Sequence, residues 1–191
     1  MTEPYAPQLE TNSPPSDSES ELVRKAKEDP LAFEQIYTRY VQPIYKYFYN
    51  RTWNELEAED LTAQTFVSAL ENIQKYHDNG HFQAWLFSIA RNKAIDHFRK
   101  NKALNTFEIP EDIPVNSDFL TDSIESERRK AIFFLFRSLP EKEKELLRLR
   151  YVAELSFASI GKLLHRSEGS VKKAIYRIVQ RMKVELEEKY G

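Results

Sequence analysis

The stretch from Leu155 to Met182 constrains the fold more than any other part of this sequence. Ser156 can cap the N-terminus of a short helix that we predict over 157–164, and residues 165–167 then form a tight turn. A second helix begins near Glu168, and its apolar residues recur every three or four positions, which makes one buried stripe. That stripe consists of Val171, Ile175, Ile178, Met182 and Leu186. A short helix, a tight turn and an amphipathic helix are typical of a helix-turn-helix.

Two residues support this interpretation of the turn. Gly161 lies where two steeply crossing helices need a residue with almost no side chain. His165 stands where such turns commonly have Gly, and histidine can enter the left-handed backbone region at some cost. We therefore expect a slightly strained turn.

The outward face of the second helix is basic. Residues 168–183 hold five Lys or Arg residues and one acid, which suits a phosphate backbone. The residues that face away from the apolar stripe are Lys173, Tyr176, Arg177 and Gln180, with Lys172 and Arg181 at its edge. This pattern favours a helix that enters the DNA major groove. The alternative is an ordinary solvated helix in an αα-hairpin.

Composition limits the class of protein. With 191 residues and 41% apolar residues, the chain can bury one core or two small ones. Without cysteine it can form neither disulfides nor thiolate metal sites, and four glycines with few alternating apolar patterns predict an all-α fold. We find no signal peptide and no apolar run long enough to cross a bilayer, so we expect a cytoplasmic protein without membrane insertion.

The net charge of −2 hides a strong segregation of charge. Residues 1–30 carry seven acids and three bases, and residues 103–127 carry seven acids and no base. By contrast, residues 81–102 carry five bases and one acid, and residues 141–191 carry twelve bases and eight acids. Two basic blocks, each preceded by an acidic one, are compatible with binding nucleic acid at two places.

The sequence of the N-terminal half predicts a disordered tail followed by helices. Residues 1–18 are rich in proline and acids and cannot bury enough surface to order themselves. After a short helix over 20–28, a new helix can begin with Asp29 as its N-cap and Pro30 at its first position. The next helix has an apolar face made of Phe33, Ile36, Tyr37, Tyr40, Ile44 and Phe48, and leaves Tyr47, Tyr49 and Trp53 free for other contacts.

A third helix is predicted over 57–73 and a fourth begins near Phe82, after a polar loop over 76–80. The third buries Leu61, Thr65 or Phe66, Leu70 and Ile73. The fourth buries Phe82, Trp85, Leu86, Ile89, Ala90, Ala94 and Phe98 and presents a polar row of Ser88, Asn92, Asp96 and Arg99. Such a row beside basic residues can hold nucleic acid, although a solvated face explains it equally well.

Residues 103–122 lack a helical period and contain two prolines and several acids, which predicts a flexible acidic linker. Ser123 can cap a helix that runs to Phe136, and Leu139-Pro140 starts another helix that leads into the helix-turn-helix. We therefore predict two small helical domains, residues 19–102 and 123–191.

Two blocks of this chain resemble a known family, the extracytoplasmic-function sigma factors of bacterial RNA polymerase. Residues 57–100 resemble region two of that family through the runs EAEDLT with TF and FQAWLFSIARN with AID. Residues 139–182 resemble region four through LPE, LRYV and SEGSVK. The two blocks together cover most of the predicted folded chain, in the order and at the separation that the family has.

The resemblance implies partners and site residues. Region four would read the minus-thirty-five element of promoter DNA with Ser170, Lys172, Lys173, Tyr176 and Arg177. Region two would capture a flipped base of the opened minus-ten element with the loop from Tyr76 to His81, and would read that element with His81, Ser88, Asn92, Asp96 and Arg99. It would bind core RNA polymerase through Asp60, Gln64 and Ser68. The family also implies an anti-sigma factor as a partner, and neither a cofactor nor a metal.

Two other classes remain open at this point. A stand-alone helix-turn-helix regulator would explain residues 139–182 but not the block from Trp85 to Asp96. A nuclease could hold Mg²⁺ with the acids Glu55, Glu57, Glu59 and Asp60, but these lie at a helix start, where acids favour the helix dipole. No His or Lys is spaced to work with them, so we expect no enzyme and no catalytic residue.

Overall fold

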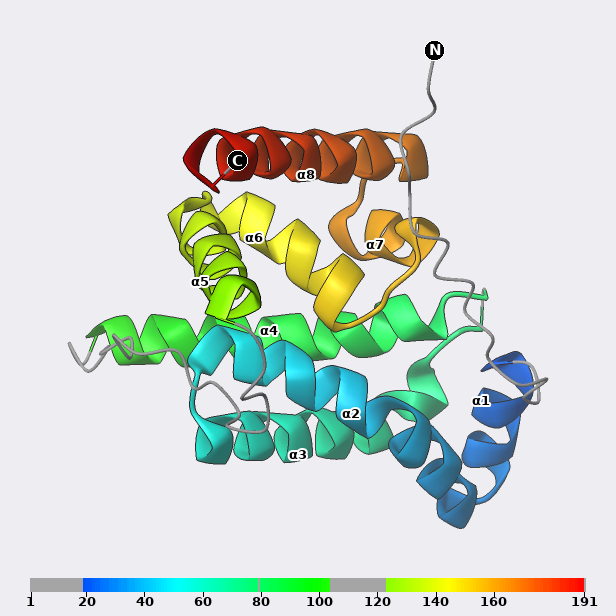
Figure 1. The fold of residues 1–191 in the computed structure, drawn as a ribbon. Helices are drawn as coiled ribbons and strands as arrows, with labels where there is room; N and C mark the ends of the chain where they lie inside the picture. Colours follow the sequence, from blue (N-terminus) through cyan, green and yellow to red (C-terminus); the bar gives the residue numbers. More distant parts are fainter. Residues whose placement is uncertain (1–18, 79, 104–122, 191) are drawn as a thin grey trace.

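The computed structural model describes residues 19–78, 80–103 and 123–190, and every regular element in these ranges is helical (Figure 1). An N-terminal unit contains α1 (Glu19–Glu28), η1 (Pro30–Ala32), α2 (Phe33–Thr52), α3 (Glu55–Asn72), η2 (Ile73–Lys75) and α4 (Phe82–Ala103). A C-terminal unit contains α5 (Ser123–Ser138), α6 (Glu141–Leu147), the π-helical turn η3 (Arg148–Val152), α7 (Phe157–Leu164) and α8 (Glu168–Tyr190). The predicted all-α fold is confirmed. The predicted tail over 1–18, and the predicted linker apart from Ala103, lie outside the described residues.

Local capping signals set several helix boundaries. Asp29 accepts a hydrogen bond from the Leu31 backbone N–H, and Pro30 begins η1, which leads directly into α2. The α2 helix continues through Pro43 and ends where Trp53 adopts a left-handed conformation. Asn54 then caps α3 by accepting from the Glu57 N–H at 3.1 Å. These short-range contacts make α2 and α3 an antiparallel pair.

Three predictions about the N-terminal core are wrong. Tyr37 is 45% exposed, although its ring still packs edge-to-face on Phe66. Leu70 is 44% exposed because Phe66, Ala69 and Ile73 form the inward stripe of this part of the chain. Tyr47 is fully buried rather than free, because α6 of the C-terminal unit covers it.

The α4 helix lies between the other helices of its own unit and the C-terminal unit (Figure 1). On one side it packs against α2 and α3, and on the other it contacts α7. Phe87, absent from the predicted core face, is therefore fully buried together with Leu86 and Ala90. A helix covered from two directions has no single apolar stripe, so its sequence periodicity shows only part of what it buries.

The helix-turn-helix predicted from the sequence is confirmed, and its first helix, α7, has the predicted bounds. Ser156 caps α7 by accepting from the Ser159 N–H at 3.0 Å, and His165 adopts the left-handed conformation, with φ 53° and ψ 46°. A Cβ atom added at Gly161 would lie 2.7 Å from the Arg166 carbonyl oxygen, so the close approach of α7 to the turn requires glycine here. Val171, Ile175 and Ile178 are buried as predicted, whereas Met182 and Leu186 are half-buried.

The close approach at Gly161 predicts that Gly161→Ala destabilises the protein by about 1–3 kcal/mol, the usual cost of overpacking. The backbone carbonyl that the new methyl group meets cannot move without displacing the turn. Gly169→Ala is the matched control, since nothing lies within 4 Å of an added Cβ there. Urea unfolding followed by circular dichroism measures both, and an equal free energy of unfolding for the two variants would contradict this role of Gly161.

Candidate nucleic-acid interfaces

The first candidate surface is the exposed start of α8. A shallow cavity of about 450 Å³ brings together Ser170, Lys173 and Arg177, three of the predicted residues. Arg166, which sequence reasoning did not select, also lines this cavity and donates from Nη2 to the Ser170 hydroxyl at 3.0 Å. The sequence feature that could have indicated Arg166 is its position as a basic residue inside the turn before α8. Backbone N–H groups at a helix start together with three basic side chains form a surface that attracts phosphate.

The other two predicted residues of α8 lie beside this cavity. Tyr176 packs edge-to-face on Phe157, and the Lys172 ammonium lies 5.7 Å from the Tyr176 ring centroid. Both side chains remain exposed. The five predicted residues therefore share the outward face of α8, while Val171 and Ile175 fix the helix on the core.

The second candidate surface is a cavity of about 370 Å³ between α3, η2 and α4. Asn92 and Asp96 line it, as predicted for the polar row of α4. Trp85 and Tyr76 provide aromatic walls, with their ring centroids 5.0 Å apart. The cavity is also lined by Ser68, Asn72, Lys75, Ile89 and Lys93.

The remaining predicted residues of this region lie elsewhere. His81 and Ser88 line a neighbouring cavity of about 450 Å³, which shares Lys75, Tyr76 and Trp85 with the first one. Arg99 lies one turn beyond Asp96 and forms an exposed ion pair with it at 3.0 Å. The polar row is thus divided between two cavities on either side of Trp85. Tyr76 begins the loop to which the family resemblance assigns base capture, and it lines both cavities.

The third candidate surface is the exposed face of α3. Asp60 and Gln64 are exposed there, and the Gln64 amide donates to Asp60 at 2.7 Å. Ser68 is half-buried and lines the cavity beside α4 instead, because it is rotated away from Asp60 around the helix axis. Exposed apolar side chains share the face of Asp60 at helical spacing; they are Leu56, Ala63, Val67 and Leu70.

The acids considered for a metal site have other partners or remain apart. Glu57 lies 2.9 Å from the His97 ring, and Asp60 is held by Gln64. Within the part of the chain that the structure describes, no group of three His, Cys, Asp or Glu side chains is placed to hold a metal ion. None of the described helices is long and apolar enough to cross a membrane.

Both halves of the chain match known protein families. The family "Sigma-70 region 2" matches residues 36–104, and "Sigma-70, region 4" matches residues 126–182. The ECF RNA polymerase sigma factor BldN of Streptomyces coelicolor is 33% identical over 176 residues, covering 87% of this chain and 67% of BldN. SigW and SigM of Bacillus subtilis, also ECF sigma factors, are 31% and 30% identical over 81% and 80% of this chain, and 88% and 94% of their own lengths are covered.

The fold is also found among solved structures. One such structure contains CnrH in complex with the cytosolic domain of CnrY and superposes with a TM-score of 0.62. The match covers 90% of this chain and 99% of that chain, at 20% sequence identity.

Proposed function

Because the chain belongs to the extracytoplasmic-function (ECF) sigma factors of RNA polymerase, we propose that α4 and α8 carry its two promoter-reading surfaces. As a sigma factor it binds core RNA polymerase and directs promoter recognition. The region 2 domain extends over residues 19–102 and the region 4 domain over residues 123–191. Residues 103–122 connect them, and the protein works in the cytoplasm, where the polymerase meets DNA.

The α8 surface reads the minus-thirty-five element as duplex DNA. Its support is the exposed face that carries Ser170, Lys172, Lys173, Tyr176 and Arg177 on one helix. Lys and Arg neutralise phosphates and so fix the register of the helix, while bidentate contacts to base edges select sequence.

The cavity beside α4 holds a base extruded from the minus-ten element, and this cavity carries the proposal. Its volume of about 370 Å³ falls within the usual range of small-ligand pockets, roughly 300–1,000 Å³. The half-buried Trp85, supported by the buried Tyr76 ring beside it, offers an aromatic surface for stacking, and the Asn92 amide can pair with the edge of a base. Unstacking a base costs a few kcal/mol, and contacts that exist only in the open state offset that cost.

His81, Ser88 and Arg99 continue this surface on either side of Asn92 and Asp96. His81 and Ser88 line the neighbouring cavity, where adjacent nucleotides of the opened strand would lie. Arg99 is exposed and can reach phosphate, because its ion pair with Asp96 is a surface pair of little strength.

Core polymerase docks on α3. Asp60 and Gln64 provide polar contacts, and the apolar side chains at Leu56, Val67 and Leu70 provide area that a protein partner can bury. Exposed apolar residues that share one helix face indicate a protein interface rather than a solvated surface. Ser68 lies at the edge of this face, between the docking surface on α3 and the cavity beside α4.

An anti-sigma factor is a further proposed partner. CnrH, which shares the fold, was solved together with the cytosolic domain of CnrY. A protein that engages both units could control access to both DNA surfaces at once.

The basic face of α8 predicts a measurable salt dependence. Lys173→Ala, assayed as promoter binding by the polymerase holoenzyme, should lower the slope of log K against log salt by about 0.9 if Lys173 contacts one phosphate. If Lys173 or Arg177 reads guanine instead, its loss should cost ~1–3 kcal/mol at one base position only. Lys183→Ala, an exposed base farther along α8, is the control. If holoenzymes with Lys173→Ala and with Arg177→Ala both keep the wild-type salt slope and base preference, these two residues do not belong to the interface.

The cavity beside α4 predicts a defect in promoter opening. Asn92→Ala should leave binding to core polymerase intact. It should reduce the permanganate reactivity of promoter thymines, because the extruded base loses the Asn92 amide as a hydrogen-bonding partner and the open state is less stable. Gln83→Ala, an amide on the same helix outside the cavity, should behave as wild type. Unchanged thymine reactivity in the Asn92→Ala holoenzyme would show that this cavity does not hold the opened strand.

A further inference from the structure

The last turn of α1 is joined to the end of η2 by two side-chain hydrogen bonds. The Lys27 ammonium donates to the Tyr76 backbone carbonyl at 2.5 Å, and the Gln74 side-chain amide donates to the Lys27 carbonyl at 2.7 Å. The Lys27 ammonium also lies 5.9 Å from the centroid of the Tyr76 ring. The bonded residues are 49 and 47 positions apart, so both contacts belong to the tertiary structure.

The α1 helix is a fixed support for these contacts. It packs against α2, η2 and α4 through three buried apolar side chains, which are Leu22, Val23 and Ala26. At its start, Glu19 accepts a hydrogen bond from the Tyr40 hydroxyl of α2. The helix is therefore held at both ends, and it presents the half-buried Lys27 side chain in one place.

Tyr76 is the residue at which the chain leaves η2 and enters the loop that leads to His81. Its backbone is extended, with φ −66° and ψ 126°. Because the Lys27 ammonium holds the Tyr76 carbonyl, it fixes the orientation of the first peptide group of the loop. The direction of the chain beyond Tyr76 depends on that peptide group.

The same loop has a second connection to α1. The Gly80 N–H donates to the Asp78 carboxylate at 3.0 Å, and Gly80 has a φ of 72°, so the chain turns tightly there. Hydrogen bonding from the Ser20 side chain, and next from the Gly80 N–H, lowers the pKa of Asp78, so this carboxylate is a charged acceptor at neutral pH. The loop is thus connected to the first turn of α1 through Ser20 and to the last turn through Lys27.

The Tyr76 side chain transmits this position to the wall of the proposed base cavity. Its buried ring lies with its centroid 5.0 Å from that of Trp85 and 5.4 Å from that of Phe82. Trp85 lines both cavities beside α4, whereas no described residue of α1 lines either of them. Any effect of α1 on a captured base must therefore pass through Tyr76 and the loop.

Two simpler roles for Lys27 fit the structure less well. The apolar side chains of α1 form its attachment to the core, so one hydrogen bond to a carbonyl is a small part of the stability of the fold. A direct contact with phosphate suits Lys75 better, because Lys75 is exposed and lines both cavities. The ammonium of Lys27 is half-buried and already bonded to the Tyr76 carbonyl.

We propose that Lys27 is a positioning residue for base capture. It holds the Tyr76 carbonyl so that the loop from Tyr76 to His81 and the Trp85 ring keep one arrangement before DNA enters. Ordering a loop during binding costs free energy, and a loop that is already ordered avoids this cost. The proposal rests on the proposed function of the cavity beside α4.

Hydrogen–deuterium exchange in the free full-length protein tests the positioning itself. Lys27→Met retains the length of the side chain without a donor, so peptides that cover residues 76–81 should exchange roughly two- to tenfold faster, as expected for the loss of one hydrogen bond. Lys27→Arg keeps a donor and should exchange nearly as wild type. Arg24→Ala is the matched control, because it removes the same charge from α1 while Arg24 pairs with Glu21 and Glu28 of that helix. Unchanged exchange in Lys27→Met, or equal acceleration in Arg24→Ala, would overturn the proposal.

Promoter selection by the holoenzyme tests the consequence for base capture. Each variant is assayed on a promoter found by run-off transcription and on derivatives that carry each of the four bases at each minus-ten position. Lys27→Met should lower the preference for the cognate base at one position by roughly two- to tenfold, with unchanged binding to core polymerase, and Lys27→Arg should restore it.

Two results of this assay would overturn the proposal. A merely structural role for Lys27 would lower transcription from all derivatives alike and leave the base preference unchanged. A contact with phosphate would lower the slope of log K against log salt by about 0.9 for every derivative.

Gln74→Ala provides a second route if circular dichroism shows that Lys27→Met is unfolded. It removes the other hydrogen bond at an exposed position and should cause both effects with smaller amplitude, and wild-type behaviour in both assays would overturn the proposal.

Asn92→Ala, assayed in parallel, separates this proposal from the assignment of the cavity. If Asn92→Ala impairs promoter opening while Lys27→Met keeps the base preference, the positioning role fails and the cavity assignment stands. If Asn92→Ala opens the promoter as wild type, the cavity assignment fails, and the exchange rates still decide whether Lys27 holds the loop.

Discussion

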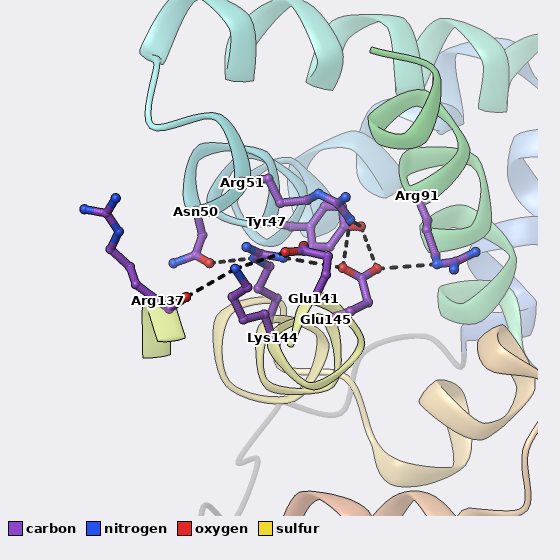
Figure 2. Close-up of polar contacts among 9 residues, drawn as sticks. Tyr47, Asn50, Arg51, Arg91, Arg137, Glu141, Lys144 and Glu145 are labelled. Carbon is purple, nitrogen blue, oxygen red and sulfur yellow. Dashed lines mark hydrogen bonds and ion pairs between the residues drawn. The ribbon is translucent and has the colours of Figure 1, made fainter. Parts of the chain in front are cut away.

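The two halves of this sigma factor share one apolar core, and a buried carboxylate, Glu145, lies at their contact. Glu145 is buried and accepts hydrogen bonds from Tyr47 and Arg51 of α2, and the Arg91 guanidinium of α4 adds an ion pair without a hydrogen bond (Figure 2). Charged side chains from α2 and α4 thus meet one side chain of α6 in the docked orientation. The burial of Tyr47 and the contact between α7 and α4 follow from that orientation.

The α4 helix is the element that both activities share. One of its faces completes the core of region 2, another lines the proposed base cavity, and a third receives α7. A helix that is covered on several sides can be exposed on one side by moving its neighbour, without unfolding.

The sequence predicted what depends on local contacts and missed what depends on distant ones. The capped turn after Glu28, the bounds of α7 and the left-handed His165 follow from residues a few positions apart. Leu70 and Tyr47 were misplaced because the rotation of α3 and the docking of α6 are decided by tertiary packing. Arg51 and Glu145 are 94 positions apart, and no periodicity in a single sequence indicates such a pair.

We expect specific promoter binding by this sigma factor to require core polymerase, because the proposed region 2 surface takes an opened strand that free duplex DNA does not offer. The most direct measurement is a titration of labelled promoter DNA, identified by run-off transcription from a genomic library, with the free protein and with the protein bound to core polymerase. The account predicts weak binding without sequence preference by the free protein, on the order of 10⁻⁴–10⁻⁶ M, and tight specific binding with core. Tight, sequence-specific binding by the free full-length chain would contradict it.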